Sequence, residues 1–421
     1  MTIEIINTGS ELMLGRVLNT HQQWLCRQLA DHGYTVERQV AIADGGHDIQ
    51  QAVRESLGRA DLIITTGGLG PTSDDLTRQL VAELLGLGLE HDPEVEQTIR
   101  HYFESRGRQV PRRTRVEALI PTGARVLPNR FGTAPGLMLT VDPNSFRPDS
   151  RRSVIIMLPG PPRELRPMFT TEVLPLLSEC FASDDRFFCR TLKTTGLGES
   201  YLEEAIAEPL AGLTASGLEL GYCARVGEVE VRLGARGSKA ADIVNRADAI
   251  VRACIAEHIF GVDDESLEAA VIRSFTAHRW TLAIAESCTG GHITNRLTNV
   301  PGASLVLVEG FITYSNDAKI RALSVGAQTL RDHGAVSEAT VREMAEGARK
   351  IAGADWSVAV TGIAGPGGGS PDKPVGTVYL AWSSAQGTTV SHQLNPFDRE
   401  TFKFLTSQQA LHGLLNLPRR D

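Results

Sequence analysis

The feature that most constrains the fold is the alternation of short apolar segments with amphipathic ones at the start of the chain. The apolar segments have the length of strands, and the amphipathic ones repeat their apolar residues at helical spacing. We expect strands over 3–8, 34–42 and 61–66, and helices over 17–32, 49–57 and 75–87. Strands that alternate with helices form a parallel sheet covered by helices on both faces. The order therefore predicts a doubly wound, mostly parallel α/β domain that binds ligands at the carboxyl ends of its strands.

Two more segments follow this domain, and we place the domains at 1–175, 180–262 and 266–421. The first domain also contains a predicted hairpin of strands 136–141 and 153–158. The middle segment is expected to be a small α+β unit, with strands over 191–195, 218–224 and 228–233 and helices over 199–210 and 239–258. The last segment is expected to be a second α/β domain, with helices over 266–278 and 398–415 and strands over 281–285, 306–313, 356–361, 376–382 and 389–394.

Composition excludes several classes of protein. The formal net charge of −8 argues against a surface that binds nucleic acid along its length, although a single anionic ligand in a local pocket fits. No apolar run approaches the ~20 residues that a membrane span needs. The six cysteines form no C-x-x-C pair, so we expect reduced thiols rather than a metal or redox site. With no signal peptide in the sequence, we expect a cytoplasmic protein that does not bind membranes.

The strongest candidate site begins where the strand over 281–285 ends, in the string AESCTGG (285–291). A serine at a strand-to-helix turn projects its hydroxyl into a cleft beside the positive end of a helix, which stabilises an oxyanion or a phosphate. Ser287 is thus a candidate nucleophile. The alternative is that Ser287 or Thr289 only caps the following helix, because both residue types are favoured at that position.

A second cluster, GFITYSNDAK (310–319), ends the next predicted strand in polar residues. If a helix begins at Asp317, then Tyr314, Ser315 and Lys319 face one cavity. A neutral lysine is a competent base for serine once desolvation lowers its pKa. The alternative is a solvated lysine on the helix surface.

A third cluster, VTGIAGPGGG (360–369), places many glycines directly after a buried strand. Glycines there expose main-chain N–H groups and allow a ligand to approach closely, although a flexible surface loop is the alternative. The string is not a Walker A loop, because no Lys-Ser or Lys-Thr pair closes it. Arg399, which opens the last helix, either binds a phosphate or pairs with Asp398.

These strings, together with HGAVSE (333–338), KPVGTVY (373–379) and FDRE (397–400), resemble the CinA C-terminal family, whose members include bacterial nicotinamide mononucleotide deamidases. The resemblance covers about 266–416. It implies hydrolysis of the nicotinamide amide to nicotinate mononucleotide and ammonia, without a metal or other cofactor. The residues that it implies are the nucleophile Ser287, its base Lys319, the supporting Tyr314 and Ser315, the pocket residues Thr289, Gly290, Thr361 and Gly362, and the phosphate-binding Arg399.

The amino-terminal domain carries its own glycine-rich turn, TTGGLGPTSDD (65–75), after its third predicted strand. Adjacent glycines at the end of a strand wrap a phosphate, and Asp74 and Asp75 are suited to hold a hydrated divalent cation that bridges it. The candidate phosphate-binding residues are Gly67, Gly68 and Gly70. Alternatively, Asp74 only caps the helix that follows.

This turn, with TGSEL (8–12) and FGTAPG (131–136), resembles the molybdopterin-binding-like domain at the amino terminus of CinA proteins, over about 3–172. In molybdenum cofactor enzymes that fold binds a pterin phosphate, and in CinA proteins it is linked to metal-dependent hydrolysis of ADP-ribose. The segment VPRRTRVEA (110–118) departs from the family, because it carries arginines where a more neutral, Asn-containing segment is expected. The substrate of this domain is therefore left open.

The middle segment resembles the KH-like unit of the same proteins. Its letters GARG (234–237) match a G-x-x-G loop, but they follow a predicted strand instead of lying between two helices. We therefore expect no nucleic-acid binding, and a structural or dimerising role in a homodimer. The whole chain is interpreted as a bifunctional hydrolase of phosphorylated nucleotides, an amidase joined to a metal-dependent pyrophosphatase. The alternatives are a non-enzymatic accessory protein of competence or recombination, and an amino-terminal domain that only binds a phosphorylated ligand.

Overall fold

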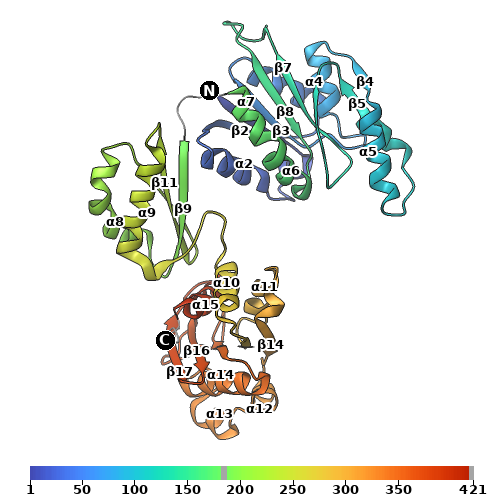
Figure 1. The fold of residues 1–421 in the computed structure, drawn as a ribbon. Helices are drawn as coiled ribbons and strands as arrows, with labels where there is room; N and C mark the ends of the chain where they lie inside the picture. Colours follow the sequence, from blue (N-terminus) through green and yellow to red (C-terminus); the bar gives the residue numbers. More distant parts are fainter. Residues whose placement is uncertain (182–186, 417–421) are drawn as a thin grey trace. The chain divides into compact units, whose positions relative to one another are not determined.

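The computed structural model describes residues 1–181 and 187–416 and divides the chain into two compact units, 1–188 and 189–421 (Figure 1). The first unit holds one α/β domain. The second holds a small four-stranded domain followed by another α/β domain. Among the described residues, no helix is both long and apolar enough to cross a membrane.

The first unit is built on a six-stranded sheet in the order β2-β1-β3-β8-β7-β6. Strands β2, β1, β3 and β8 are parallel, and β7 and β6 extend the sheet in antiparallel fashion. The predicted doubly wound, mostly parallel sheet is therefore confirmed, and β7 and β8 form the predicted hairpin. The strands are β1 (Ile3–Thr8), β2 (Val36–Ile42), β3 (Leu62–Thr66), β6 (Arg125–Leu127), β7 (Gly136–Val141) and β8 (Ser153–Leu158), with a separate pair of β4 (Leu89–His91) and β5 (Leu119–Pro121).

Helices cover both faces of this sheet. Successive residues of a strand point to opposite faces, so each strand contributes side chains to two cores. Leu62 and Ile64 of β3 pack in one core, and Ile63 packs in the other. The helices are α1 (Ser10–Met13), α2 (Thr20–Asp31), α3 (Gly46–Leu57), α4 (Thr77–Leu85), α5 (Pro93–Glu104), α6 (Pro162–Met168) and α7 (Leu174–Cys180), with a 3₁₀ segment at Arg112–Ala118. The helix predicted over 17–32 begins only at Thr20, because the Asn19 side chain accepts a hydrogen bond from Gln22 N and caps the helix there.

The second unit opens with a four-stranded sheet in the order β10-β11-β9-β12. Its strands are β9 (Phe187–Thr195), β10 (Glu219–Arg225), β11 (Glu228–Arg236) and β12 (Ile259–Val262), and its helices are α8 (Glu199–Thr214) and α9 (Ala240–Ile255). Most of the GARG string lies inside β11, so its glycines do not form a loop between helices.

The rest of the second unit is a five-stranded sheet in the order β14-β13-β15-β16-β17. Strands β14, β13 and β15 are parallel, whereas β16 and β17 are antiparallel additions. The strands are β13 (Leu282–Glu286), β14 (Leu307–Ile312), β15 (Trp356–Gly362), β16 (Thr377–Ser384) and β17 (Gly387–Leu394). The central position of β13 places its carboxyl end between two parallel neighbours, which is where ligands bind in open α/β sheets.

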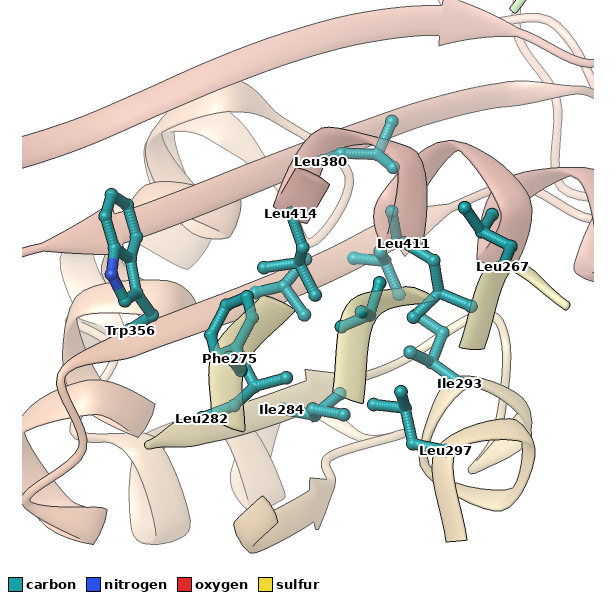
Figure 2. Packing of buried hydrophobic residues seen from close by; sticks show 14 of the residues in the cluster. Leu267, Phe275, Leu282, Ile284, Ile293, Leu297, Trp356, Leu380, Leu411 and Leu414 are labelled. Atoms are coloured by element: carbon teal, nitrogen blue, oxygen red, sulfur yellow. The ribbon is translucent and has the colours of Figure 1, made fainter. Parts of the chain in front are cut away.

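Two cores sandwich this sheet. On one face, Phe275 of α10 and Leu411 and Leu414 of α15 pack with Leu282 and Ile284 of β13 (Figure 2). On the other face, the sheet presents small residues such as Ala283, Ala285 and Ala359 to α12, α13 and α14. The helices are α10 (Leu267–His278), α11 (His292–Thr298), α12 (Asn316–Leu323), α13 (Ala327–His333), α14 (Glu338–Ala352) and α15 (Arg399–Leu415).

Candidate functional sites

Ser287 lies one residue beyond the end of β13. Its N–H donates to the carbonyl of Val360 at 3.1 Å, which extends the pairing of β13 with β15 by one residue. The chain then turns through Gly290 (φ 63°) and Gly291 (φ 96°), two left-handed conformations that favour glycine, and enters α11. The side chain of Ser287 is 8% exposed and caps no helix.

Glu286 holds this turn, and sequence reasoning missed it. Its carboxylate is fully buried and accepts hydrogen bonds from the main-chain N–H groups of Gly291 (3.0 Å), Ile293 (3.1 Å) and Thr294 (2.9 Å). The hydroxyls of Thr289 (2.6 Å) and Thr294 (2.7 Å) donate to it as well. The signal in the sequence is an ionisable residue at the end of an apolar strand, because such residues are rarely fully buried unless they are paired.

Lys319 lies in the first turns of α12, after β14. It is 1% exposed, so it is not a solvated surface lysine. Its Nζ donates to the carbonyl of Thr313 at 2.8 Å and lies 3.0 Å from Ser287 Oγ. Burial lowers the pKa of Lys319, and the nearby Cys288 thiol opposes this only in part. Within the described residues no carboxylate forms an ion pair with Lys319, so little compensates its positive charge for desolvation.

A cavity of about 280 Å³ surrounds this pair. The sequence-predicted residues that line it are Ser287, Tyr314, Lys319, Thr361, Gly362 and Arg399. Three other predicted residues, Ser315, Thr289 and Gly290, are not among the described lining residues. The hydroxyl of Ser315 instead accepts from Ala318 N at 3.1 Å and caps α12. The lining residues not named in advance include Cys288, Ala335, Val336 and several residues of the glycine-rich loop.

Arg399 ties the two sides of the cavity together. Its Nη2 donates to the hydroxyl of Tyr314, and its Nη1 donates to the carbonyl of Gly365, each at 2.9 Å. Asp398 does not pair with it in the described part of the chain; the Asp398 carboxylate accepts from the N–H groups of Glu400 and Thr401 and caps α15. Arg399 is therefore a cation at the cavity, with guanidinium N–H groups beyond these two contacts.

The amino-terminal turn lines a second cavity, of about 350 Å³, at the carboxyl ends of β1 and β3. All five residues predicted for this site line it: Gly67, Gly68, Gly70, Asp74 and Asp75. Gly67 (φ 97°) and Gly68 (φ 69°) adopt left-handed conformations, which explains the adjacent glycines. Asp74 is not the cap of α4, because that helix begins at Thr77 with no side-chain cap.

Six carboxylates line this second cavity, from Glu11, Asp44, Asp74, Asp75, Glu117 and Glu164. Residues 1–181 and 187–416 contain no group of three or more His, Cys, Asp or Glu side chains arranged to hold a metal ion. A hydrated Mg²⁺ needs only one or two carboxylates when water and substrate phosphates complete its shell. The oxygen-rich lining therefore offers the kind of ligands that a hydrated divalent cation takes.

Glu117 is the most perturbed of these carboxyl groups. It is 1% exposed, accepts from the Thr133 hydroxyl at 3.0 Å through Oε1, and has no described hydrogen-bond partner for Oε2. Burial raises its pKa to about 7, against smaller opposing effects of Thr133 and the Arg78 guanidinium. The sequence around Glu117 gives little signal of this, since it is one acidic residue in a segment rich in arginine.

These observations define a two-unit α/β protein with a buried serine–lysine pair in one cavity and an acidic, glycine-rich cavity elsewhere. Three family models match the chain: probable molybdopterin binding domain over 4–179, damage-inducible protein CinA KH domain over 189–261, and CinA C-terminal domain over 264–417. A CinA-like protein of Akkermansia muciniphila is 43% identical over 420 residues, covering 100% of this chain and 98% of that protein. The chain belongs to the CinA family, which confirms the resemblance drawn from the sequence strings.

Other relatives carry related names. A competence-damage inducible protein of Symbiobacterium thermophilum is 43% identical over 385 residues, covering 90% of this chain and 88% of that protein. The crystal structure of the competence/damage inducible protein CihA from Agrobacterium tumefaciens is 44% identical and covers 36% of this chain and 92% of that one, with a TM-score of 0.34.

Proposed function

We propose that the carboxy-terminal domain hydrolyses the amide of nicotinamide mononucleotide to nicotinate mononucleotide and ammonia. The observation that carries this proposal is the 3.0 Å contact between Lys319 Nζ and Ser287 Oγ inside a cavity. Acyl transfer through a serine requires a nucleophile within hydrogen-bond reach of a base. The family resemblance supplies the substrate, and the buried pair supplies chemistry that fits an amide.

The carbonyl of Thr313 orients the base. A neutral Lys319 amine donates one hydrogen to that carbonyl and turns its lone pair toward the Ser287 hydroxyl. As Ser287 Oγ bonds to the amide carbon, its proton passes to Lys319. The carbon–nitrogen bond then breaks, and Lys319 returns the proton to the nitrogen, which leaves as ammonia. A water molecule hydrolyses the acyl-enzyme with Lys319 again as the base, and Ser287 is regenerated.

Arg399 is proposed to bind the phosphate of the nucleotide. The guanidinium lines the cavity and uses two N–H groups on Tyr314 and Gly365, which leaves others for phosphate oxygens. Tyr314, 63% exposed at the cavity, is proposed to contact the substrate beside it. Thr361 and Gly362 are proposed to form the wall, with the Thr361 hydroxyl bonded to Ala335 O at 2.8 Å.

The test is to incubate the full chain with nicotinamide mononucleotide in EDTA and to measure ammonia and nicotinate mononucleotide. We expect equal amounts of both products from the natural chain and none from the Ser287→Ala variant. Absence of ammonia from the folded natural chain would overturn the proposal and favour an accessory role in competence, as the names of relatives suggest.

A second function is proposed for the amino-terminal domain: metal-dependent hydrolysis of the pyrophosphate of ADP-ribose. It is supported by the carboxylate-rich cavity beside the glycine turn. A divalent ion held by Asp74 and Asp75 would neutralise charge on the pyrophosphate. We expect EDTA to abolish ADP-ribose cleavage and to leave ammonia release unchanged. We expect the same two results from the Asp75→Asn variant. Inhibition of both reactions by EDTA would refute this division between the domains.

We further propose that the protein works as a cytoplasmic homodimer and does not bind nucleic acid. The position of Gly234, Ala235 and Arg236 within β11 supports a structural role for the middle domain. Light scattering on the purified chain and a gel-shift titration with single-stranded RNA test these two points. A monomer, or RNA binding at physiological salt, would contradict them.

A further inference from the structure

Most main-chain N–H groups around Ser287 donate to an oxygen of the protein. The N–H of Ser287 donates to the carbonyl of Val360 at 3.1 Å. The N–H of Gly290 donates to the carbonyl of Ser287 at 3.2 Å, and that of His292 to the carbonyl of Thr289 at 3.3 Å. The next ones, of Gly291, Ile293 and Thr294, donate to the Glu286 carboxylate. In the described part of the chain, the N–H groups of Cys288 and Thr289 have no oxygen acceptor, and the one partner given for both is the Cys288 sulfur.

Both residues are buried, and their N–H groups have no strong acceptor. Cys288 is 6% exposed and Thr289 is fully buried. Orphaned buried N–H groups are rare in native proteins, because each costs the free energy of a lost hydrogen bond. The acceptor that both N–H groups share is the Cys288 sulfur, which accepts hydrogen bonds only weakly. Two adjacent donors therefore remain available directly after the candidate nucleophile.

The amino-terminal end of α11 is not available in the same way. The sequence predicts that this helix end stabilises an anion beside Ser287. In the structure, the Glu286 carboxylate accepts from the N–H groups of Ile293 and Thr294 and places a negative charge against the helix end. These N–H groups are therefore occupied, so donors for a substrate oxyanion beside Ser287 must be other groups.

We propose that the N–H groups of Cys288 and Thr289 form the oxyanion hole of the amidase, and that Glu286 is a positioning residue that holds them in place. The inference rests on the proposed amidase function. When Ser287 Oγ adds to the amide carbon, the carbonyl oxygen becomes an anion, and the N–H of the residue after a nucleophile is well placed to bind it. Glu286 fixes the turn on its far side and keeps competing donors occupied.

Glu286→Gln tests the positioning role. The amide keeps the shape of the side chain but turns an NH₂ group toward donors of the turn, so the two N–H groups lose their alignment. We expect kcat to fall by ~10²–10³-fold with KM changed by less than about 3-fold, as for the loss of an oxyanion donor. The matched control is Glu268→Gln, which removes a carboxylate of α10 that accepts a hydrogen bond from Arg296 Nε of α11 at 2.5 Å. The control should lower thermal stability and leave kcat unchanged.

A second variant removes the donor itself. This variant carries lactic acid at position 288. Lactic acid has the side chain of alanine but an ester oxygen in place of the main-chain N–H. The matched reference is therefore the Cys288→Ala chain, which differs from it only in that N–H. We expect the ester chain to lose kcat by ~10²-fold at unchanged KM. Absence of ammonia from the natural chain would defeat the proposed amidase function. If the natural chain releases ammonia normally and the kcat of the ester chain lies within about 3-fold of its reference, only the oxyanion assignment would be overturned.

Discussion

Lys319 Nζ and Ser287 Oγ lie 3.0 Å apart although 32 positions separate the two residues in the chain. The sheet brings them together, because Ser287 follows β13, Lys319 follows β14, and these two strands are parallel neighbours. Thr313 N donates to Glu286 O at 2.8 Å and continues the pairing one residue past the end of β14. The carboxyl ends of adjacent parallel strands meet at one edge, so the pair is a product of topology.

Because burial lowers the pKa of Lys319, ammonia release should increase with pH as this amine loses its proton. The plateau should be reached well below the pH of about 10.4 at which a free lysine titrates. The pH profile of kcat for the natural chain measures this. An acid limb near the free-lysine value would mean that Lys319 is charged in the resting enzyme.

Glu117 predicts a pH dependence of stability. The folded chain holds the Glu117 proton up to about 7, whereas a model carboxyl loses it near 4.5. The folded state thus binds more protons in this window, and the free energy of unfolding falls as pH rises through it. Glu117→Gln removes this loss, which is at most ~3 kcal/mol. Calorimetry of both proteins at pH 5 and pH 8 tests this. The melting temperature of the variant, relative to that of the natural chain, should be higher at pH 8 than at pH 5. A constant difference would contradict it.

Arg399→Ala should chiefly raise KM for nicotinamide mononucleotide, because a phosphate contact is equal in the ground and transition states. The control is nicotinamide riboside, which has no phosphate and should show little difference between the two enzymes. Tyr314→Phe removes the hydroxyl that accepts from Arg399 but keeps the guanidinium, so its KM should change less. A fall in kcat alone for Arg399→Ala would assign this residue to the reacting amide.

The fragment 266–421 should fold alone and retain most of the amidase rate, since it contains every proposed amidase residue and most of both cores of its sheet. It loses contacts such as Gln408 Nε2 to Glu228 Oε1 at 2.6 Å. Steady-state kinetics of this fragment beside 189–421 tests the prediction. A soluble, folded 266–421 fragment without activity would show that the middle domain completes the site.

Much of the fold could be read from the sequence, because buried strands and the glycines after them are local signals. The strands ending at Thr66 and Glu286 and the turns that follow were placed in this way. The start of α2 was misplaced by three residues, since the cap at Asn19 depends on one side-chain contact.

The site could be read only in part. Ser287 and Ser315 both follow strands and precede helices, yet one faces the cavity and the other caps α12. Serine has the same local preference in both roles, so only tertiary contacts separate them. The hydroxyl of Thr289 likewise donates to Glu286. Neither Glu286 nor Glu117 could be singled out, because their partners are set by packing between segments.

The most direct test of the central claim is ammonia release by the natural chain, Ser287→Ala, Lys319→Met and the double variant. Lys319→Met keeps an unbranched stem and removes the proton acceptor, and Ser287→Ala removes the nucleophile. Each single change should lower kcat by orders of magnitude, and the double variant should be little worse than either, because the pair acts as one unit. Near-normal turnover by either single variant would contradict the covalent mechanism and indicate a water molecule activated by another base.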